Sequence, residues 1–436
     1  MFKPALAVAA ALCLVAGGAL AQLSDTEQRI VAAAKGRSAA ALELLEKSVR
    51  INSGTLNPEG VRAVGEIFRA ELEGLGFRTR WVEMPPSMKR AGHLAAVHEG
   101  NGTGKRVLLL GHLDTVFEKS SSVPLWERQG DRVRGQGVND MKGGDVIMIE
   151  ALRALKSAGA LDGAQIEVLL TGDEERTGAP LKTARAEMVA MGQRADVALS
   201  FEGSARHDGM DTASIARRSS GGWVLRVTGK AAHSMGVFSE ASGYGAIYEA
   251  ARILNAFREQ VIEPSLTFNP GLVFGGTSIG YAEDTATASA FGKSNVIARE
   301  AEVRGDLRYL SPEQGERARQ KMQAIVSTGN LPGTSATIRF SESYPPMPPT
   351  EAGRQLAALY SRASQDAGLG PIGLLDPTFR GAGDVQFVAP YTTGLDGLGA
   401  QGRGAHTDDE DLEIASIERG TLRAALLIHR LTQAAR

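Results

Sequence analysis

Histidine and carboxylate side chains follow three short apolar runs of this sequence. The segments directly after these runs are Gly111-His112-Leu113-Asp114, Asp173-Glu174-Glu175 and Glu202-Gly203. Apolar runs of this length, bounded by glycine or acidic residues, are typical of buried strands. Open α/β sheets hold their ligands at the carboxyl ends of strands, so we expect these side chains to meet at one edge of a sheet.

Two further segments add candidate ligands. Asp140 stands immediately before a predicted helix at 142–158, and His406 lies in a glycine-containing segment near the C-terminus. Asp140 alone would be interpreted as a helix N-cap, and an isolated histidine or acidic pair as a solvated loop. Together, however, two histidines and three carboxylates are a suitable set for a hydrolytic pair of divalent ions, with open positions for water.

The elements that must position these residues have the pattern of an α/β domain. Predicted strands alternate with helical spacing in the first half of the chain, which favours a sheet with crossover connections. We expect the strands at 78–84, 94–98, 106–110, 166–170 and 197–201, and later helices at 354–368 and 414–434.

A second pattern begins near residue 215. Its predicted order is strand 223–227, helix 243–257, strands 266–274 and 301–309, helix 312–326 and strand 337–340. This order predicts a ferredoxin-like α+β unit. Four prolines between 344 and 349 then indicate a return linker. The expected division is a signal segment at 1–21, a catalytic domain at 22–214 and 344–436, and an inserted domain at 215–343.

Composition and the first residues limit the function classes. The 436 residues carry 48 Lys plus Arg against 50 Asp plus Glu, a balance that disfavours a nucleic-acid-binding protein. Residues 1–21 have a basic start, an apolar run and small residues before Gln22, which predicts a cleaved secretory signal and a periplasmic or secreted protein without a stable membrane anchor. The only cysteine, Cys13, lies inside this segment, so cysteine chemistry is not expected in the mature chain.

The ordered set Gly-His-x-Asp-Thr, Asp-Met-Lys-Gly-Gly, Asp-Glu-Glu, Ser-Phe-Glu and a late Gly-x-His resembles the co-catalytic zinc aminoacylase and carboxypeptidase superfamily. The resemblance extends over essentially the whole mature chain. It implies a zinc-exopeptidase-like central mixed sheet with helices on both faces. It also implies that the ferredoxin-like insertion is a lid that can form a homodimer.

The resemblance also implies a role for each residue of the motifs. His112 and Glu202 would bind one ion, Glu175 and His406 the other, and Asp140 would bridge the two. Zn²⁺ is the first expectation for both ions, with Co²⁺ or Mn²⁺ as alternatives. Asp114 would orient the His112 imidazole. Glu174 would act as general base toward the attacking water, and the alternative is that Glu174 binds metal while Glu175 is the base.

Three residues of the insertion match substrate-binding positions of the superfamily. His233 would reach a neighbouring active site and polarise the scissile carbonyl, while Asn295 would bind substrate and Arg308 would hold its carboxylate. Each has an alternative without function, namely a strand-end histidine or a surface ion pair. The sequence departs from the superfamily pattern at Ala298, at Ala382, in the turn 235–242 and in a longer segment at 277–293.

These observations predict an exported two-zinc metallohydrolase. Glu rather than Asp at position 202 favours hydrolysis of a C-terminal residue or of an N-acyl amino acid, within this resemblance. We therefore expect cleavage of an amide next to a free carboxylate, as in a glutamate-type carboxypeptidase. The alternatives are an N-acyl amino acid deacylase and, from another class, a metal-bearing binding protein without turnover.

Overall fold

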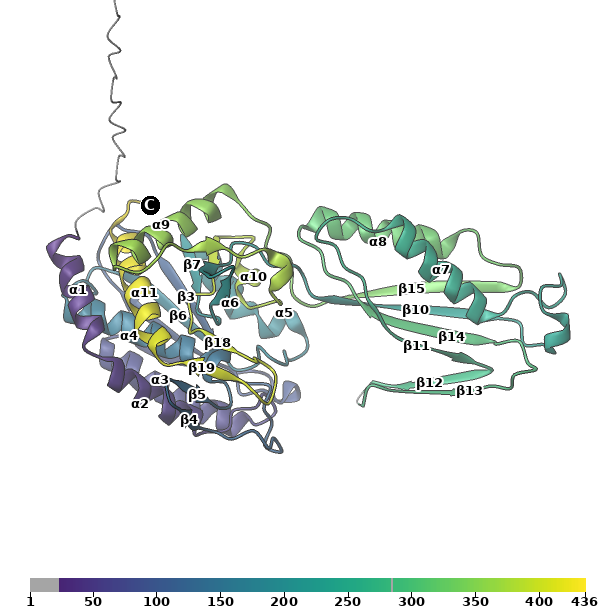
Figure 1. Ribbon diagram of the computed structural model, residues 1–436, viewed down its shortest axis with the longest axis horizontal. Coiled ribbons are helices and arrows are strands. Elements are labelled where there is room, and N and C mark those ends of the chain that lie inside the picture. The colour runs from purple at the N-terminus through teal and green to yellow at the C-terminus, as the bar shows by residue number, and fades with distance from the viewer. Residues whose placement is uncertain (1–22, 284) are drawn as a thin grey trace, which may run out of the picture.

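The computed structural model describes residues 23–283 and 285–436 and has two parts joined along one long axis (Figure 1). The predicted signal segment 1–21 and Cys13 lie outside the described residues. Within those residues, no helix is long and apolar enough to span a membrane. The mixed α/β architecture expected from the sequence is confirmed.

A six-stranded mixed sheet forms the centre of the larger part. Its order is β1-β2-β6-β3-β7-β17. The strands are β1 (Arg78–Val82), β2 (His93–Glu99), β3 (Val107–His112), β6 (Gln165–Thr171), β7 (Val197–Ser200) and β17 (Thr393–Asp396). Strand β2 is antiparallel to β1 and β6, whereas β6, β3, β7 and β17 are parallel to one another. The carboxyl ends of these four parallel strands therefore share one edge.

Helices cover both faces of this sheet, as expected. Leu109 and Val168 pack into a core on one face, while Leu108 and Leu169 pack into a separate core on the other. This alternation follows from the two-residue period of a strand whose two faces are both buried. The helices are α1 (Asp25–Lys35), α2 (Ser38–Val49), α3 (Pro58–Leu75), α4 (Gly143–Ser157), α5 (Leu181–Ala184), α6 (Ala186–Arg194), α9 (Glu351–Asp366), α10 (Val385–Val388) and α11 (Ala415–Gln433).

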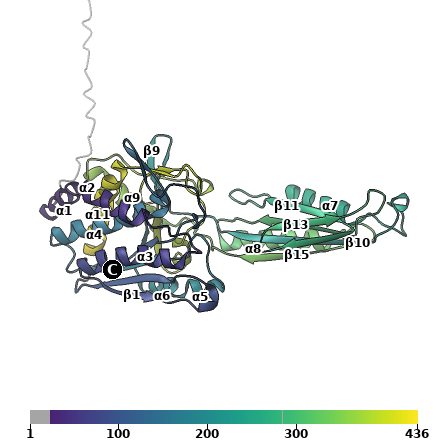
Figure 2. The same cartoon turned by 90° about the horizontal axis from the view of Figure 1, so that it is seen from below.

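The second part is a four-stranded antiparallel sheet with two helices packed on one face (Figure 2). Its elements are β10 (Gly221–Gly229), α7 (Ala246–Gln260), β11 (Pro270–Gly276), β14 (Glu300–Asp306), α8 (Pro312–Ser327) and β15 (Thr334–Glu342). The spatial order β11-β14-β10-β15 is that of the expected split unit. Trp223 and Phe257 meet edge to face, with ring centroids 5.8 Å apart, in a core of its own. We keep 215–343 as the proposed extent of the insertion.

Several short strands were not expected from the sequence. The segment at 277–293 contains a hairpin of β12 (Ser278–Ala282) and β13 (Thr287–Phe291). Two small sheets flank the larger part: β18-β19-β5-β4 and β16-β9-β8. Their strands are β4 (Glu127–Gln129), β5 (Arg132–Arg134), β8 (Ala205–His207), β9 (Met210–Ala213), β16 (Gly373–Leu374), β18 (Gly402–Arg403) and β19 (Asp411–Glu413). Runs of two to four residues carry too little periodicity to be recognised in a sequence.

Candidate metal centre and its cavity

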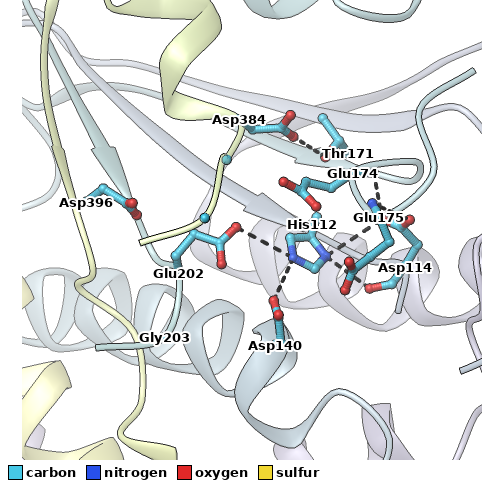
Figure 3. Close-up of polar contacts among 12 residues, drawn as sticks. His112, Asp114, Asp140, Thr171, Glu174, Glu175, Glu202, Gly203, Asp384 and Asp396 are labelled. Atoms are coloured by element: carbon cyan, nitrogen blue, oxygen red, sulfur yellow. Dashed lines mark hydrogen bonds and ion pairs between the residues drawn. The ribbon is translucent and has the colours of Figure 1, made fainter. Parts of the chain in front are cut away.

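The carboxyl ends of three parallel strands bring the predicted ligands together (Figure 3). His112 is the last residue of β3. Glu174 and Glu175 lie in the loop after β6, and Glu202 follows β7. The fourth segment, at Asp140, is a tight turn that leads into α4.

Asp140 stands between the two histidines and presents one carboxylate oxygen to each. His112 Nε2 lies 3.1 Å from Asp140 Oδ1, and His406 Nε2 lies 3.1 Å from Asp140 Oδ2. Glu202 Oε1 is 3.6 Å from His112 Nε2, and Glu175 Oε2 is 3.0 Å from His406 Nε2. All five residues given as ligands by the motifs are thus within one site.

The donor set fits a pair of divalent ions. His112, Asp140 and Glu202 form one group, and Asp140, Glu175 and His406 form the other; in each group the candidate ligand atoms lie within 4.8 Å of one another. One imidazole and two carboxylates in each group are ligands suited to zinc. Glu175 Oε1 is buried with no hydrogen-bond partner among the described residues, as an oxygen that requires a cation would be.

The carboxyl groups of this site have shifted pKa values. Burial raises the pKa of Glu202 to about 7. Burial also raises the pKa of Glu174 well above its usual range, and the nearby carboxylates of Glu202 and Asp384 add to the shift. For Asp140 burial acts in the same direction, but the hydrogen bonds to His112 and His406 outweigh it and hold its pKa well below the usual range. Crowded buried carboxylates of this kind need positive charge to share their site.

The contacts of Asp114 differ from the expectation that its side chain orients the His112 imidazole. The Nδ1 atom of His112 lies 3.0 Å from the backbone carbonyl oxygen of Asp114 and 3.7 Å from its carboxylate, so the carbonyl holds the imidazole. The Asp114 carboxylate instead accepts the backbone N–H groups of Glu174 and Glu175, at 3.0 and 3.1 Å, and the Thr55 hydroxyl at 2.6 Å. It therefore fixes the loop that carries both glutamates.

Glu410 is a positioning residue that the sequence did not reveal. Its Oε1 accepts the backbone N–H groups of Asn139 and Asp140, at 2.9 and 3.0 Å. The Glu410 side chain is fully buried, and burial raises its pKa to about 8. It stands four residues after His406, which is the only local signal that could have pointed to it. Glu410 thus connects the His406 segment to the backbone of Asn139 and Asp140.

Replacing Glu410 with Ala is expected to weaken metal binding about 10- to 100-fold, the usual cost of losing a group that orients a ligand. The variant leaves two backbone N–H groups beside Asp140 without an acceptor. Glu410→Gln retains an amide oxygen at this position and should recover most of the affinity. Competition with a chromophoric chelator measures both. Equal affinity in wild type and Glu410→Ala would exclude the proposed role.

A buried arginine connects the Glu174 loop to the Gly381–Asp384 segment. Arg185 donates to Asp173 Oδ1 at 2.6 Å and to Asp384 Oδ1 at 2.9 Å. Its Nη2 lies 3.4 Å from the Tyr344 hydroxyl, which itself donates to the Glu174 carbonyl at 2.8 Å. Charge-assisted hydrogen bonds thereby hold the Gly381–Asp384 segment against the loop that contains Asp173 and Glu174.

A cavity of about 300 Å³ opens beside the candidate ligands, a size at the lower end of small-molecule sites. Asp140, Glu174, Glu202 and His406 line one part of it. The remainder is lined by Arg217, Phe379, Arg380, Gly381, Ala382 and Ala405. The two arginines were not predicted. Arg217 has no motif around it, and Arg380 directly precedes the segment that departs from the superfamily pattern at Ala382.

The three predicted residues of the insertion are not in this cavity. His233 and Asn295 are exposed and close together, since Ser234 N–H donates to the Asn295 carbonyl at 2.9 Å. They follow β10 and precede β14, at the end of the sheet that points away from the larger part (Figures 1 and 2). Arg308 lies at the other end of that sheet and donates to Asp306 at 2.9 Å. The roles of all three stay predictions.

The sequence is similar to families of peptidases and amidohydrolases. Residues 108–430 match peptidase family M20/M25/M40. Carboxypeptidase G2 from Pseudomonas sp. (strain RS-16) is 29% identical over 432 residues, which cover 98% of this chain and 97% of the relative. Succinyl-diaminopimelate desuccinylase from Delftia acidovorans is 23% identical over 390 residues, which cover 86% of this chain and 94% of that protein.

Solved structures share the fold at low sequence identity. The aminopeptidase PepT from Bacillus cereus superposes with a TM-score of 0.73 at 18% identity, covering 90% of this chain and 98% of its own. A dinuclear metal-binding peptidase of family M20 from Bacillus subtilis superposes with a TM-score of 0.64 at 14% identity, covering 92% and 99%. At these identities the likeness establishes the fold alone.

Proposed function

We propose a reaction from the premise that this chain belongs to peptidase family M20/M25/M40 and is a metal-dependent hydrolase. In this proposal it cleaves an amide bond next to a free carboxylate, as a glutamate-type carboxypeptidase does. One observation carries the proposal: Asp140 presents an oxygen to each histidine of a two-ion site, and Glu174 lines the same cavity. The similarity to carboxypeptidase G2 over nearly the full length supports the substrate class.

The side chains of the site divide the work between binding and proton transfer. When bound, a pair of divalent ions supplies Lewis acidity and a water of lowered pKa. Glu174 would take a proton from the attacking water at its carboxylate and return it to the leaving amine. Asp114 and Tyr344 hold the backbone of Glu174 in place, through its N–H and its carbonyl respectively. His112 directs Nε2 toward Asp140, where it would bind an ion, because Nδ1 contacts the Asp114 carbonyl oxygen.

A second candidate function is the hydrolysis of N-acyl amino acids. It is supported by the similarity to succinyl-diaminopimelate desuccinylase over most of the chain. Both candidates use the same two-ion chemistry. They differ in whether the amino acid is released from a peptide or folate-like donor or from a simple acyl group. The third expectation, a metal-bearing binding protein without turnover, is not retained, because the chain belongs to a family of hydrolases.

Release of amine from a substrate panel tests the proposed function. We expect release from peptides with a C-terminal Glu or Asp, or from folates, in protein loaded with Zn²⁺, and loss of that release in the presence of a chelator. N-acetyl and N-succinyl amino acids are the comparison set. Faster release from these acyl donors would favour the deacylase, and no release from any compound by protein with both ions bound would contradict the proposed function.

Three finer properties belong to the same proposal. We infer that Zn²⁺ occupies both positions in the cell, on the basis of the mixed nitrogen and oxygen ligands. We infer a homodimer through the insertion, because His233 and Asn295 are exposed and do not line the cavity of their own chain. Export to the periplasm or medium rests on residues 1–21 alone, and N-terminal sequencing of the mature protein tests it.

A further inference from the structure

Two arginines form the wall of the cavity that faces the metal ligands. Arg217 is 3% exposed and Arg380 is 15% exposed, yet both side chains line the same 300 Å³ space as Glu174 and Glu202. Buried guanidinium groups are rare unless they are paired, because moving a charge out of water is costly. Two buried guanidinium groups beside this site are therefore expected to have negatively charged partners.

Among the described residues, Asp396 is the one carboxylate within 4.0 Å of either guanidinium group. Asp396, the last residue of β17, forms an ion pair with Arg217 through Oδ2. The same oxygen lies 3.6 Å from Arg380 Nη2, which is too long for a hydrogen bond. Arg217 also donates to the carbonyl oxygens of Gly381 and Ala382, at 2.9 and 2.7 Å, so its donors are largely used.

Arg380 is the less satisfied of the two arginines. Its Nη1 donates to the Gly203 carbonyl at 2.8 Å, directly after the metal ligand Glu202. Its Nε and Nη2 are buried and have no hydrogen-bond partner among the described residues. Arg380 thus shares the Asp396 carboxylate with Arg217 and keeps two nitrogen atoms without an acceptor, beside a cavity that a substrate must enter.

The other predicted anchor for a carboxylate lies elsewhere. Arg308 forms its ion pair with Asp306 and does not line this cavity. Beside Arg380, the ring of Phe379 is 63% exposed and packs against His207 with centroids 4.8 Å apart, giving the cavity an aromatic side. The wall therefore combines one cation with one apolar surface.

We propose that Arg380 binds an anionic group of the substrate in addition to the carboxylate next to the scissile amide, so that the preferred substrates are amides carrying two carboxylates. This inference rests on the proposed amide hydrolysis and narrows its substrate class. Arg217 and Asp396 act as positioning residues that hold the wall. The second carboxylate belongs either to the leaving amino acid, as in Glu, or to the acyl group, as in succinyl.

Pairs of substrates that differ only by an acid and its amide test the proposal. N-acetyl-Glu against N-acetyl-Gln varies the amino acid half, and N-succinyl-Leu against its succinamide counterpart varies the acyl half. In wild type we expect kcat/KM to favour the acid about 10- to 100-fold in one of the two pairs, the range for a hydrogen bond to a charged group. The pair that shows the preference identifies the half of the substrate that Arg380 contacts.

Arg380→Gln should remove this preference, and Arg380→Lys should keep part of it, since a point charge remains without the fork of donors. Arg403→Gln is the matched control: it removes one positive charge from a residue that is 73% exposed and outside the cavity. It should leave the preference unchanged. A preference that survives in Arg380→Gln, or that falls equally in Arg403→Gln, would overturn the proposal.

Binding without turnover separates this inference from the proposed function. Calorimetric titration of the Glu174→Gln protein with each acid and amide should give the same 10- to 100-fold difference, lost when Arg380→Gln is added. Hydrolysis without any acid preference would leave the proposed function standing and exclude the subsite. A binding difference without hydrolysis of any compound by the wild type would support the subsite and exclude the proposed function.

Discussion

Replacing Glu174 with Gln is expected to lower kcat by a factor of about 10² to 10⁴ while both metal ions stay bound, the range for removing a general acid–base group. Glu174 lines the cavity next to the ligands but belongs to neither group of residues that could hold an ion. The amide has nearly the shape of the carboxylate but cannot accept and return a proton. Steady-state kinetics with metal analysis of the same preparation measures both quantities.

The neighbouring variant Glu175→Gln is the matched control, because it makes the same chemical change one residue away. Glu175 Oε2 lies 3.0 Å from His406 Nε2 within the second group of ligands. We expect this variant to lose one metal equivalent, and Glu174→Gln to lose none. Loss of metal in Glu174→Gln with retention in Glu175→Gln would exchange the two roles, the alternative considered from the sequence. Unchanged turnover in Glu174→Gln would contradict its role as base.

The ligand set could be recognised from the sequence because it follows the strand ends. The candidate ligands His112, Glu175 and Glu202 each come within a few residues of the end of a parallel strand, where local hydrophobic patterning is strong. A parallel sheet places successive strand ends at one edge whatever the details of packing. The mixed sheet and the inserted α+β unit could be predicted because their longer strands and helices also have clear hydrophobic periods.

The positioning and wall residues had no comparable signal. Glu410 accepts the N–H of Asn139 from 271 positions away, and Arg217 forms its ion pair with Asp396 from 179 positions away. Such contacts depend on how loops pack, which no local period encodes. The sequence predicts that Asp114 orients the His112 imidazole. In the structure the backbone carbonyl of Asp114 contacts that ring, while its carboxylate accepts the backbone N–H groups of Glu174 and Glu175.

The inserted sheet separates His233 from the cavity of its own chain. Strand β10 begins at Gly221, close to the larger part, and runs for nine residues to Gly229. At roughly 3.3 Å per residue its far end is about 26 Å from its start. His233 follows that end of β10 and Asn295 precedes β14, whereas Glu174 follows β6 of the larger part. A contribution of His233 to catalysis is therefore expected in the site of a second subunit.

The imidazole of His233 has the tautomer that such a role requires. Its Nδ1 accepts the backbone N–H of Met235 at 3.2 Å, so a neutral ring carries its proton on Nε2. The side chain is exposed, and Nε2–H can donate to the oxygen of a scissile carbonyl as negative charge develops there. We expect His233→Ala to lower kcat about 10²- to 10³-fold with metal content unchanged, as for the loss of one oxyanion donor.

Mixed dimers test whether this contribution comes from the partner subunit. When His233→Ala and Glu174→Gln chains are unfolded, mixed in equal amounts and refolded, about half of the dimers contain one chain of each kind. Each mixed dimer then has one site with both Glu174 and His233 intact, so activity should return to about one quarter of the wild-type value. The double variant His233→Ala/Glu174→Gln mixed with the His233→Ala chain should show no recovery, because no pairing restores an intact site. Absence of recovery in exchanged dimers of the single variants would place His233 within its own chain or outside the reaction, since every other requirement of the site is present in that mixture.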